Sequence, residues 1–166
     1  LGAIAVFREP MPLEAISDID AETDLLDGLV EKGLARQADS ENYDVHDLVR
    51  EFLTRSMDES LRQELHSNAK LWYRTRHGIA AERIEYIHHL NESGDTEGLA
   101  EVLSTEGHSL VRAGHTELLG ILRPLEGQSF DPQSWCIIRE LRGDILSIQG
   151  RWDEAEAEYE AAIPLA

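Results

Sequence analysis

The residues best placed to do chemistry are His46 and Asp47, in the stretch YDVHDLVREF. They lie where an expected β-hairpin gives way to an expected amphipathic helix. An imidazole at such a junction can donate a hydrogen bond to a phosphate oxygen, and a carboxylate at a helix start can accept from free backbone N–H groups. Two interpretations stay open: a ligand-binding junction, or His46 packed between hairpin and helix with Asp47 as an ordinary N-cap.

A second group of side chains has the chemistry of metal ligands. Glu85 and His89 are four residues apart in an expected helix, and His88 is adjacent, so one helix face could offer two ligands. His66 and His77 could add more only if the fold brought them together. Histidines paired on a helix without a longer signature are usually surface or half-buried residues. The sequence therefore predicts no metal site.

Catalytic signatures are absent from the sequence. Cys136 lies inside the helical run SWCIIRE, where we expect a buried apolar cysteine and not a nucleophile. The sequence contains no G-x-x-x-x-G-K-[ST], G-x-S-x-G or H-E-x-x-H. We therefore expect no catalytic residue, no enzyme activity and no cofactor in this chain.

The composition is strongly acidic. Among 166 residues, 33 are acidic and 15 basic, which gives a net charge of −18. Such a surface repels phosphate backbones, so direct nucleic-acid binding is disfavoured. Lys32 and Lys70 are the only lysines, a pattern that also fits a high-salt cytoplasm. A single cysteine excludes an intramolecular disulfide and favours a reducing, cytoplasmic location. No apolar run approaches the roughly 18 residues of a membrane span.

Residues 1–57 predict a winged-helix domain. An apolar helix at 1–7, a short helix opened by Pro12 and a helix at 21–32 closed by Gly33 come first. Two short strands, LARQA and YDVHD, then flank the polar turn DSEN. From Asp47 the helical stripe resumes through Leu48, Val49, Phe52 and Leu53. The chain starts without a basic n-region, so we expect no signal peptide here, and it starts without Met, so we expect it to be taken from a longer chain.

The rest of the chain predicts helical hairpins. Residues 58–125 give short helices joined by tight polar turns, and a loop is expected at 126–134. Residues 126–166 match the start of a tetratricopeptide-like repeat array. A solenoid repeat cannot bury its apolar face alone, so we expect the array to continue. The predicted fold is mainly α, of α-solenoid type after the winged helix. The residues assigned structural roles in this repeat are Gly143, Gly150, Ala155, Tyr159 and Ala162.

The order of these regions resembles that of the STAND signal-transduction NTPases, of the NB-ARC and maltose-regulon-activator types. In that family a winged helix with a His-Asp pair before an LVREF-like helix follows the ATPase core, and helical repeats come next. AVFREPMPLEAI is similar to the opening of that winged helix. The resemblance covers essentially the whole chain, but the ATPase core is lacking. The family's Met-His-Asp is Val45-His46-Asp47 here.

The resemblance implies a non-catalytic regulatory and protein-interaction role. The winged helix would pack on an ATPase domain of the same parent chain, and His46 would reach the β-phosphate of ADP there. ADP or ATP would thus be a cofactor of the full-length parent only. The helical repeats would bind a protein or peptide partner, and the parent could regulate transcription.

The alternative is a DNA-binding winged-helix transcription regulator. Its groove-reading helix would be the one at 21–32, which is rich in carboxylates. Residues 1–57 contain 13 acidic and five basic residues, a net charge of −8. A groove-reading helix needs the opposite sign. The sequence therefore favours the interaction role.

Overall fold

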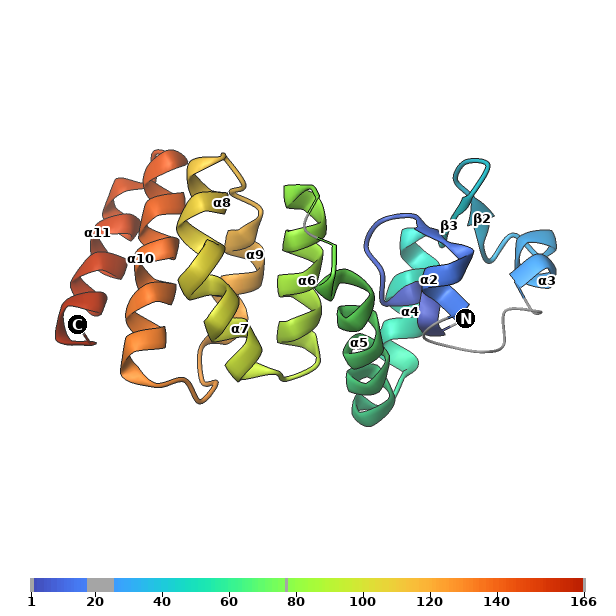
Figure 1. Cartoon of the computed structure of the whole chain (residues 1–166), viewed down its shortest axis with the longest axis horizontal. Coiled ribbons are helices and arrows are strands. Elements are labelled where there is room, and N and C mark those ends of the chain that lie inside the picture. The colour runs from blue at the N-terminus through green and yellow to red at the C-terminus, as the bar shows by residue number, and fades with distance from the viewer. Residues whose placement is uncertain (1, 18–25, 77, 166) are drawn as a thin grey trace. The chain divides into compact units, whose positions relative to one another are not determined.

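The computed structural model describes residues 2–17, 26–76 and 78–165, and these are mainly helical, as expected (Figure 1). The chain divides into two compact units. One comprises Leu1–Gly78 and Glu92–Gly94, and the other comprises Ile79–Asn91 and Asp95–Ala166. This division differs from the expected domain boundaries after residues 57 and 125.

The first unit combines short helices with a small antiparallel sheet. The sheet order is β1-β3-β2, with Met11 opposite Tyr43 and Arg36 opposite Asp44. The expected hairpin is confirmed as β2 and β3, but β1 was not expected. A proline is tolerated there because β1 is an edge strand. The first elements of this unit are α1 (Gly2–Ala5), β1 (Met11–Pro12), α2 (Leu13–Ser17), α3 (Leu26–Glu31), β2 (Arg36–Gln37) and β3 (Asn42–Asp44).

The expected helix at 21–32 is described only from Leu26, since residues 18–25 lie outside the described part of the chain. Gly33 follows α3 with a φ of 68°, a conformation that favours glycine. The N–H of Gly33 donates to the carbonyl of Val30 at 3.0 Å, and the N–H of Leu34 donates to that of Leu29 at 2.9 Å. Gly33 therefore ends the helix as expected.

Helix α5 (Glu59–Arg74) packs within the first unit. The Tyr73 hydroxyl lies 3.1 Å from Sδ of Met11 in β1, and the Tyr73 ring meets Phe7 edge-on with centroids 6.1 Å apart. A Cβ on Gly2 would lie 3.1 Å from a Leu65 methyl group. These contacts with α1 and β1 explain why the first unit extends beyond residue 57.

The second unit is built from helical hairpins around one apolar core. Its largest fully buried members include Leu99, Leu118, Ile138, Leu141 and Ile145. The elements are α6 (Ala80–Glu92), α7 (Thr96–Val102), the π-helical turn η2 (Leu103–Gly107), α8 (His108–Arg112), α9 (Leu118–Leu122), the 3-10 turn η3 (Arg123–Leu125), α10 (Pro132–Ile148), α11 (Trp152–Ala162) and the 3-10 turn η4 (Ile163–Leu165).

The loop before α10 is shorter than the expected 126–134, because α10 begins at Pro132. The Asp131 carboxylate accepts the Ser134 N–H at 3.1 Å and caps the helix. Proline is well suited to the first helical position, where its missing N–H has no partner to lose. Across the described residues, no helix is long and apolar enough to cross a membrane.

Candidate functional site

The junction before α4 (Asp47–Ser56) places His46 and Asp47 at the surface. His46 is the N-cap residue, and its carbonyl accepts from the N–H groups of Val49 at 2.8 Å and Arg50 at 2.9 Å. Its side chain makes no capping bond. Asp47 is the first helical residue, so its expected N-cap role is wrong by one position. The packing of His46 between hairpin and helix is also wrong, because this side chain is exposed.

The buried acid at this junction is Asp44, which is 5% exposed. Arg36 of β2 donates to Oδ2 through Nε at 3.1 Å and Nη2 at 2.6 Å, and Arg50 of α4 donates to Oδ1 at 2.5 Å. Burial alone would raise the pKa of Asp44. The bonds from Arg36 and the Val45 backbone, with the charge of Arg50, outweigh burial and lower that pKa.

Asp44 was not predicted from the sequence, although the register of the hairpin contained a usable signal. Arg36 and Asp44 are directly opposite on β2 and β3, and cross-strand partners of opposite charge attract. Asp44 thereby joins the hairpin to α4. This contact positions the start of α4 and the exposed His46.

The helix that follows exposes an apolar pair. Leu48 is 80% exposed and Phe52 is 70% exposed, although both belong to the stripe that the sequence predicts. Together with Glu51, Arg55 and Ser56 they line an open hollow, here called the α4 surface. Arg55 pairs with Glu51 at 2.7 Å along one edge. Exposed apolar side chains beside charged ones are typical of protein interfaces.

The α10–α11 hairpin is closely packed. A Cβ on Gly143 would lie 2.4 Å from Cε1 of Tyr159, so only glycine fits without displacement. Ala155 and Ala162 of α11 are buried, at 2% and 6% exposure. Gly150 forms the turn with a φ of 74°. These are the five residues to which the sequence assigns structural roles in a repeat.

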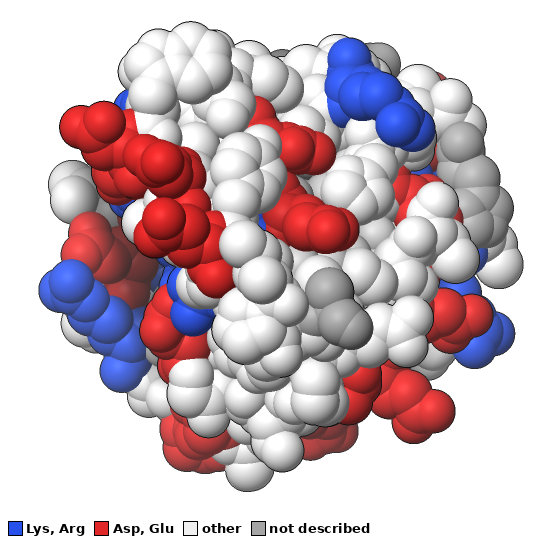
Figure 2. All heavy atoms as spheres, turned by 90° about the vertical axis from the view of Figure 1, so that its left-hand side faces the viewer, with Lys and Arg blue, Asp and Glu red and all other residues white. Residues whose placement is uncertain are grey.

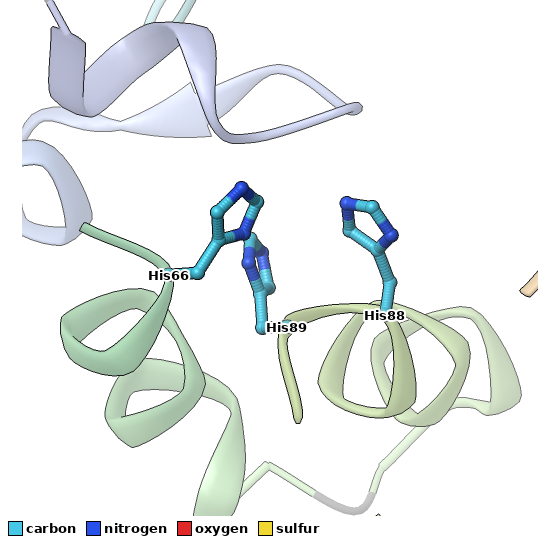
Figure 3. A group of neighbouring side chains, drawn as sticks. All are labelled: His66, His88 and His89. Carbon is cyan, nitrogen blue, oxygen red and sulfur yellow. The ribbon is translucent and has the colours of Figure 1, made fainter. Parts of the chain in front are cut away.

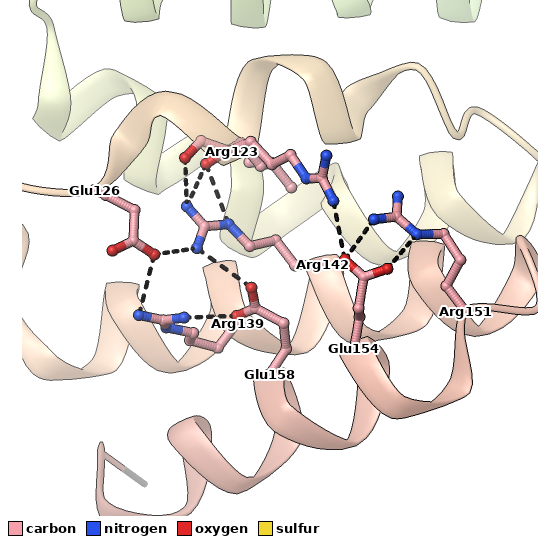
Figure 4. A network of polar contacts seen from close by, with 8 residues as sticks. Arg123, Glu126, Arg139, Arg142, Arg151, Glu154 and Glu158 are labelled. Carbon is pink, nitrogen blue, oxygen red and sulfur yellow. Dashed lines mark hydrogen bonds and ion pairs between the residues drawn. The ribbon is translucent and has the colours of Figure 1, made fainter.

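Arg142 of α10 joins this hairpin to the preceding helix (Figure 4). Arg142 is 1% exposed, and its guanidinium donates to the carbonyl of Leu122 through Nε at 3.1 Å and to that of Arg123 at 3.2 Å. Those carbonyls lie where α9 passes into η3, so Arg142 satisfies groups that a helix end leaves without partners. Its Nη1 also pairs with Glu126 at 3.0 Å and Glu158 at 3.6 Å.

Cys136 is buried at the start of α10, as expected. Burial raises the pKa of its thiol, and the Glu140 carboxylate, 3.9 Å from Sγ, raises it further. Because the thiolate is the nucleophile, a raised pKa makes this cysteine unreactive at neutral pH.

The histidines considered as metal ligands are distributed over two helices (Figure 3). His88 and His89 are adjacent in α6, with ring centroids 5.2 Å apart, and His66 belongs to α5. Glu85 and His89 are buried in α6. His77 lies outside the described residues.

Comparisons with known proteins do not identify this chain. No family model matches the sequence, and no curated protein or solved structure matches it either.

Proposed function

We propose that this chain is the regulatory, non-catalytic part of a multidomain cytoplasmic signalling ATPase, with a possible role of the parent in transcription. In this proposal the first unit is a winged helix that docks on a nucleotide-binding domain of the same parent chain. The observation that carries the proposal is the α4 surface, where Leu48 and Phe52 are 80% and 70% exposed. Exposure of two large apolar side chains to water is unfavourable, and burying them under a docked domain would lower the free energy.

The order of elements supports the winged-helix assignment. Three short helices precede a β-hairpin, and the sheet order β1-β3-β2 places the hairpin beside an edge strand from between the first two helices. The three helices and the hairpin follow the order expected from the sequence, and a third strand, β1, joins the sheet.

The exposure of His46 supports a nucleotide-sensing role. His46 immediately precedes the helix that bears the α4 surface, so a domain docked there would meet its imidazole. A ring nitrogen that carries a proton can donate to a phosphate oxygen of ADP. In this role His46 contributes to holding the docked state without taking part in catalysis.

The second unit supports a partner-binding role. Its α10–α11 hairpin has the small residues and turn of the predicted tetratricopeptide-like repeat, and stacked helical hairpins offer extended surfaces to proteins and peptides. DNA binding by the winged helix is less well supported, since α3 carries Asp27 and Glu31 and no basic residue.

The proposal is tested first on the native polypeptide. An immunoblot with an antibody against this chain should detect a protein much larger than 18.7 kDa in the source cell. The polypeptide should contain a P-loop upstream of this region. A native band near 18.7 kDa would contradict the proposal.

Docking is tested with the nucleotide-binding region of that polypeptide, expressed separately. The Leu48→Ser/Phe52→Ser variant should bind it at least tenfold more weakly than the unmodified chain does, because two apolar contacts are lost. Leu71→Ser is the matched control, since Leu71 is also exposed, at 52%, on another helix of the same unit. Equal affinity of all three proteins would contradict docking through α4.

A further inference from the structure

Helix α11 exposes a stripe of large apolar side chains along one of its sides. Trp152 is 67% exposed, Tyr159 is 37% exposed and Ile163, just after the helix, is 73% exposed. Spacings of seven and four residues place them along one side of a helix. The small residues Ala155 and Ala162 are buried. Tyr159 packs its ring on Gly143 of α10 and still leaves 37% of its surface exposed, whereas Trp152 and Ile163 are mostly exposed.

A row of carboxylates lies beside this stripe. Helix α11 contains five acidic residues and no basic one. Glu154 pairs with Arg151, and Glu158 pairs with Arg139 at 2.8 Å. For the other three, no cationic side chain lies within ion-pair distance in the described part of the chain. These are Asp153, Glu156 and Glu160.

The three unpaired carboxylates have the spacing of one helix face. They are three and four residues apart, which places them in a row along α11, next to the apolar stripe. Figure 2 shows the side of the second unit on which α11 lies, where acidic side chains gather beside a band of uncharged ones. The α11 surface is defined here as Trp152, Tyr159 and Ile163 with Asp153, Glu156 and Glu160.

We propose that the α11 surface is a docking site for a basic amphipathic α-helix of a partner protein. This inference rests on the proposed partner-binding role of the second unit and names the chemistry of the partner. An apolar face would cover Trp152, Tyr159 and Ile163. Lysines or arginines at helical spacing would pair with the row of carboxylates, since charge complementarity selects the partner and its register.

Charge also argues against a second copy of this chain as the occupant. Two α11 helices placed face to face would bring Glu156 and Glu160 of each copy toward carboxylates of the other. Like charges across an interface disfavour association. A basic helix meets the same apolar stripe without this repulsion.

Trp152 is the expected centre of the binding energy. Tryptophan is enriched among the residues that dominate protein interfaces, because it buries a large area with little loss of side-chain freedom. Trp152→Ala should therefore weaken binding by at least tenfold. The carboxylates should add salt dependence, since the charges at an exposed interface are screened.

The test uses the whole chain and a defined probe, a fluorescein-labelled 18-residue peptide of leucine and lysine patterned as an amphipathic helix. Fluorescence anisotropy measures its affinity. A peptide of serine and lysine with the same charge controls for attraction to an acidic protein. We expect the first peptide to bind and the second to bind at least tenfold more weakly.

Matched charge variants locate the site. Asp153→Asn/Glu156→Gln/Glu160→Gln changes the net charge of −18 to −15, as does Glu41→Gln/Glu97→Gln/Glu101→Gln, which alters exposed carboxylates elsewhere. Only the α11 variant should weaken binding at least tenfold, with both variants retaining the circular dichroism of the unmodified chain.

Three results would overturn the inference. Equal weakening by the two triple variants would mean attraction to net charge alone. Equal affinity for the leucine–lysine and serine–lysine peptides would remove the role of the apolar stripe. Self-association in sedimentation that Trp152→Ala abolishes would make a second copy the occupant. Leu71→Ser, a change of an exposed apolar residue outside both surfaces, should leave peptide binding unchanged. Docking through α4 is measured with a different protein, so failure here is distinguishable from failure of that docking.

Discussion

Gly143 and Tyr159 approach so closely that a Cβ at residue 143 would lie 2.4 Å from Cε1 of the tyrosine ring. Tyr159 is held there from its other end, because its hydroxyl donates to Oδ1 of Asp144 at 2.8 Å. The α10–α11 hairpin thus depends on a residue without a side chain in one helix and an aromatic ring in the other.

Gly143→Ala should therefore destabilise the protein, by about 1–3 kcal/mol, since overpacking forces the ring or the helix to move. Gly120→Ala is the matched control, because Gly120 is helical and a Cβ there would meet nothing within 4 Å. That control should stabilise the protein by up to about 1 kcal/mol, through the better helix propensity of alanine. Urea unfolding measures both, and equal effects would contradict the packing argument.

Asp44→Asn should lower the free energy of unfolding at neutral pH by about 1–3 kcal/mol, because Arg36 and Arg50 lose a shared carboxylate. The folded-state pKa of Asp44 is below its ordinary value of 3.8. Its stabilising contribution is therefore present above the unfolded-state pKa and is lost as pH falls through the folded-state pKa. Below about pH 4, the free energy of unfolding should depend less on pH in the Asp44→Asn variant than in the unmodified chain. Asp47→Asn, at an exposed position, should change neither the free energy of unfolding at neutral pH nor its pH dependence by much.

Burial holds His66 in its neutral form. Desolvation, helped by the charge of Arg62, lowers the pKa of His66 to about 4 from 6.5. The unfolded chain therefore binds a proton between these values that the folded chain does not, so stability falls as pH drops from about 6.5 to about 4. Up to about 3 kcal/mol should be lost across this window.

His66→Gln should remove most of this pH dependence, whatever its effect at neutral pH. His46→Gln serves as the control, because His46 is exposed in the same unit. Urea unfolding at half-unit pH intervals makes the comparison. A parallel decline in the variant and the unmodified chain would contradict the assignment.

Arg142→Lys should keep the charge but lose most of the stabilisation, because an ammonium group cannot reproduce the planar fork that reaches the carbonyls of Leu122 and Arg123. We expect a loss of about 2–3 kcal/mol, the range for hydrogen bonds of a buried charged group. Arg151→Lys tests an exposed ion pair instead and should cost at most about 1 kcal/mol. Thermal unfolding measures the stability of both variants. A similar loss of stability in Arg142→Lys and Arg151→Lys would mean that burial of Arg142 is unimportant.

The sequence predicted the elements that depend on local patterns. The hairpin around DSEN, the end of α3 at Gly33 and the close approach at Gly143 follow from turn residues, a C-cap glycine and the spacing of small residues. Strand β1 was missed because a two-residue edge strand ending in proline has no pattern of its own. Its pairing with β3 is a tertiary contact.

The candidate sites were less predictable than the elements. Helical periodicity identified Leu48 and Phe52 as one face of α4, but it does not tell whether another element covers that face. It also gave no sign that Arg142, a charged residue, would be buried against the end of α9. Both outcomes depend on contacts between segments far apart in the sequence.

The most direct test of the proposed docking is the thiol labelling rate of a Phe52→Cys variant in the full-length native polypeptide. Cys136 is buried, so its background should be low. We predict slow labelling with ADP bound and at least tenfold faster labelling with ATP bound, because docking covers residue 52 only in the closed state. Leu71→Cys should label equally in both. Fast labelling of residue 52 in both nucleotide states, at the rate of the isolated chain, would contradict docking through α4.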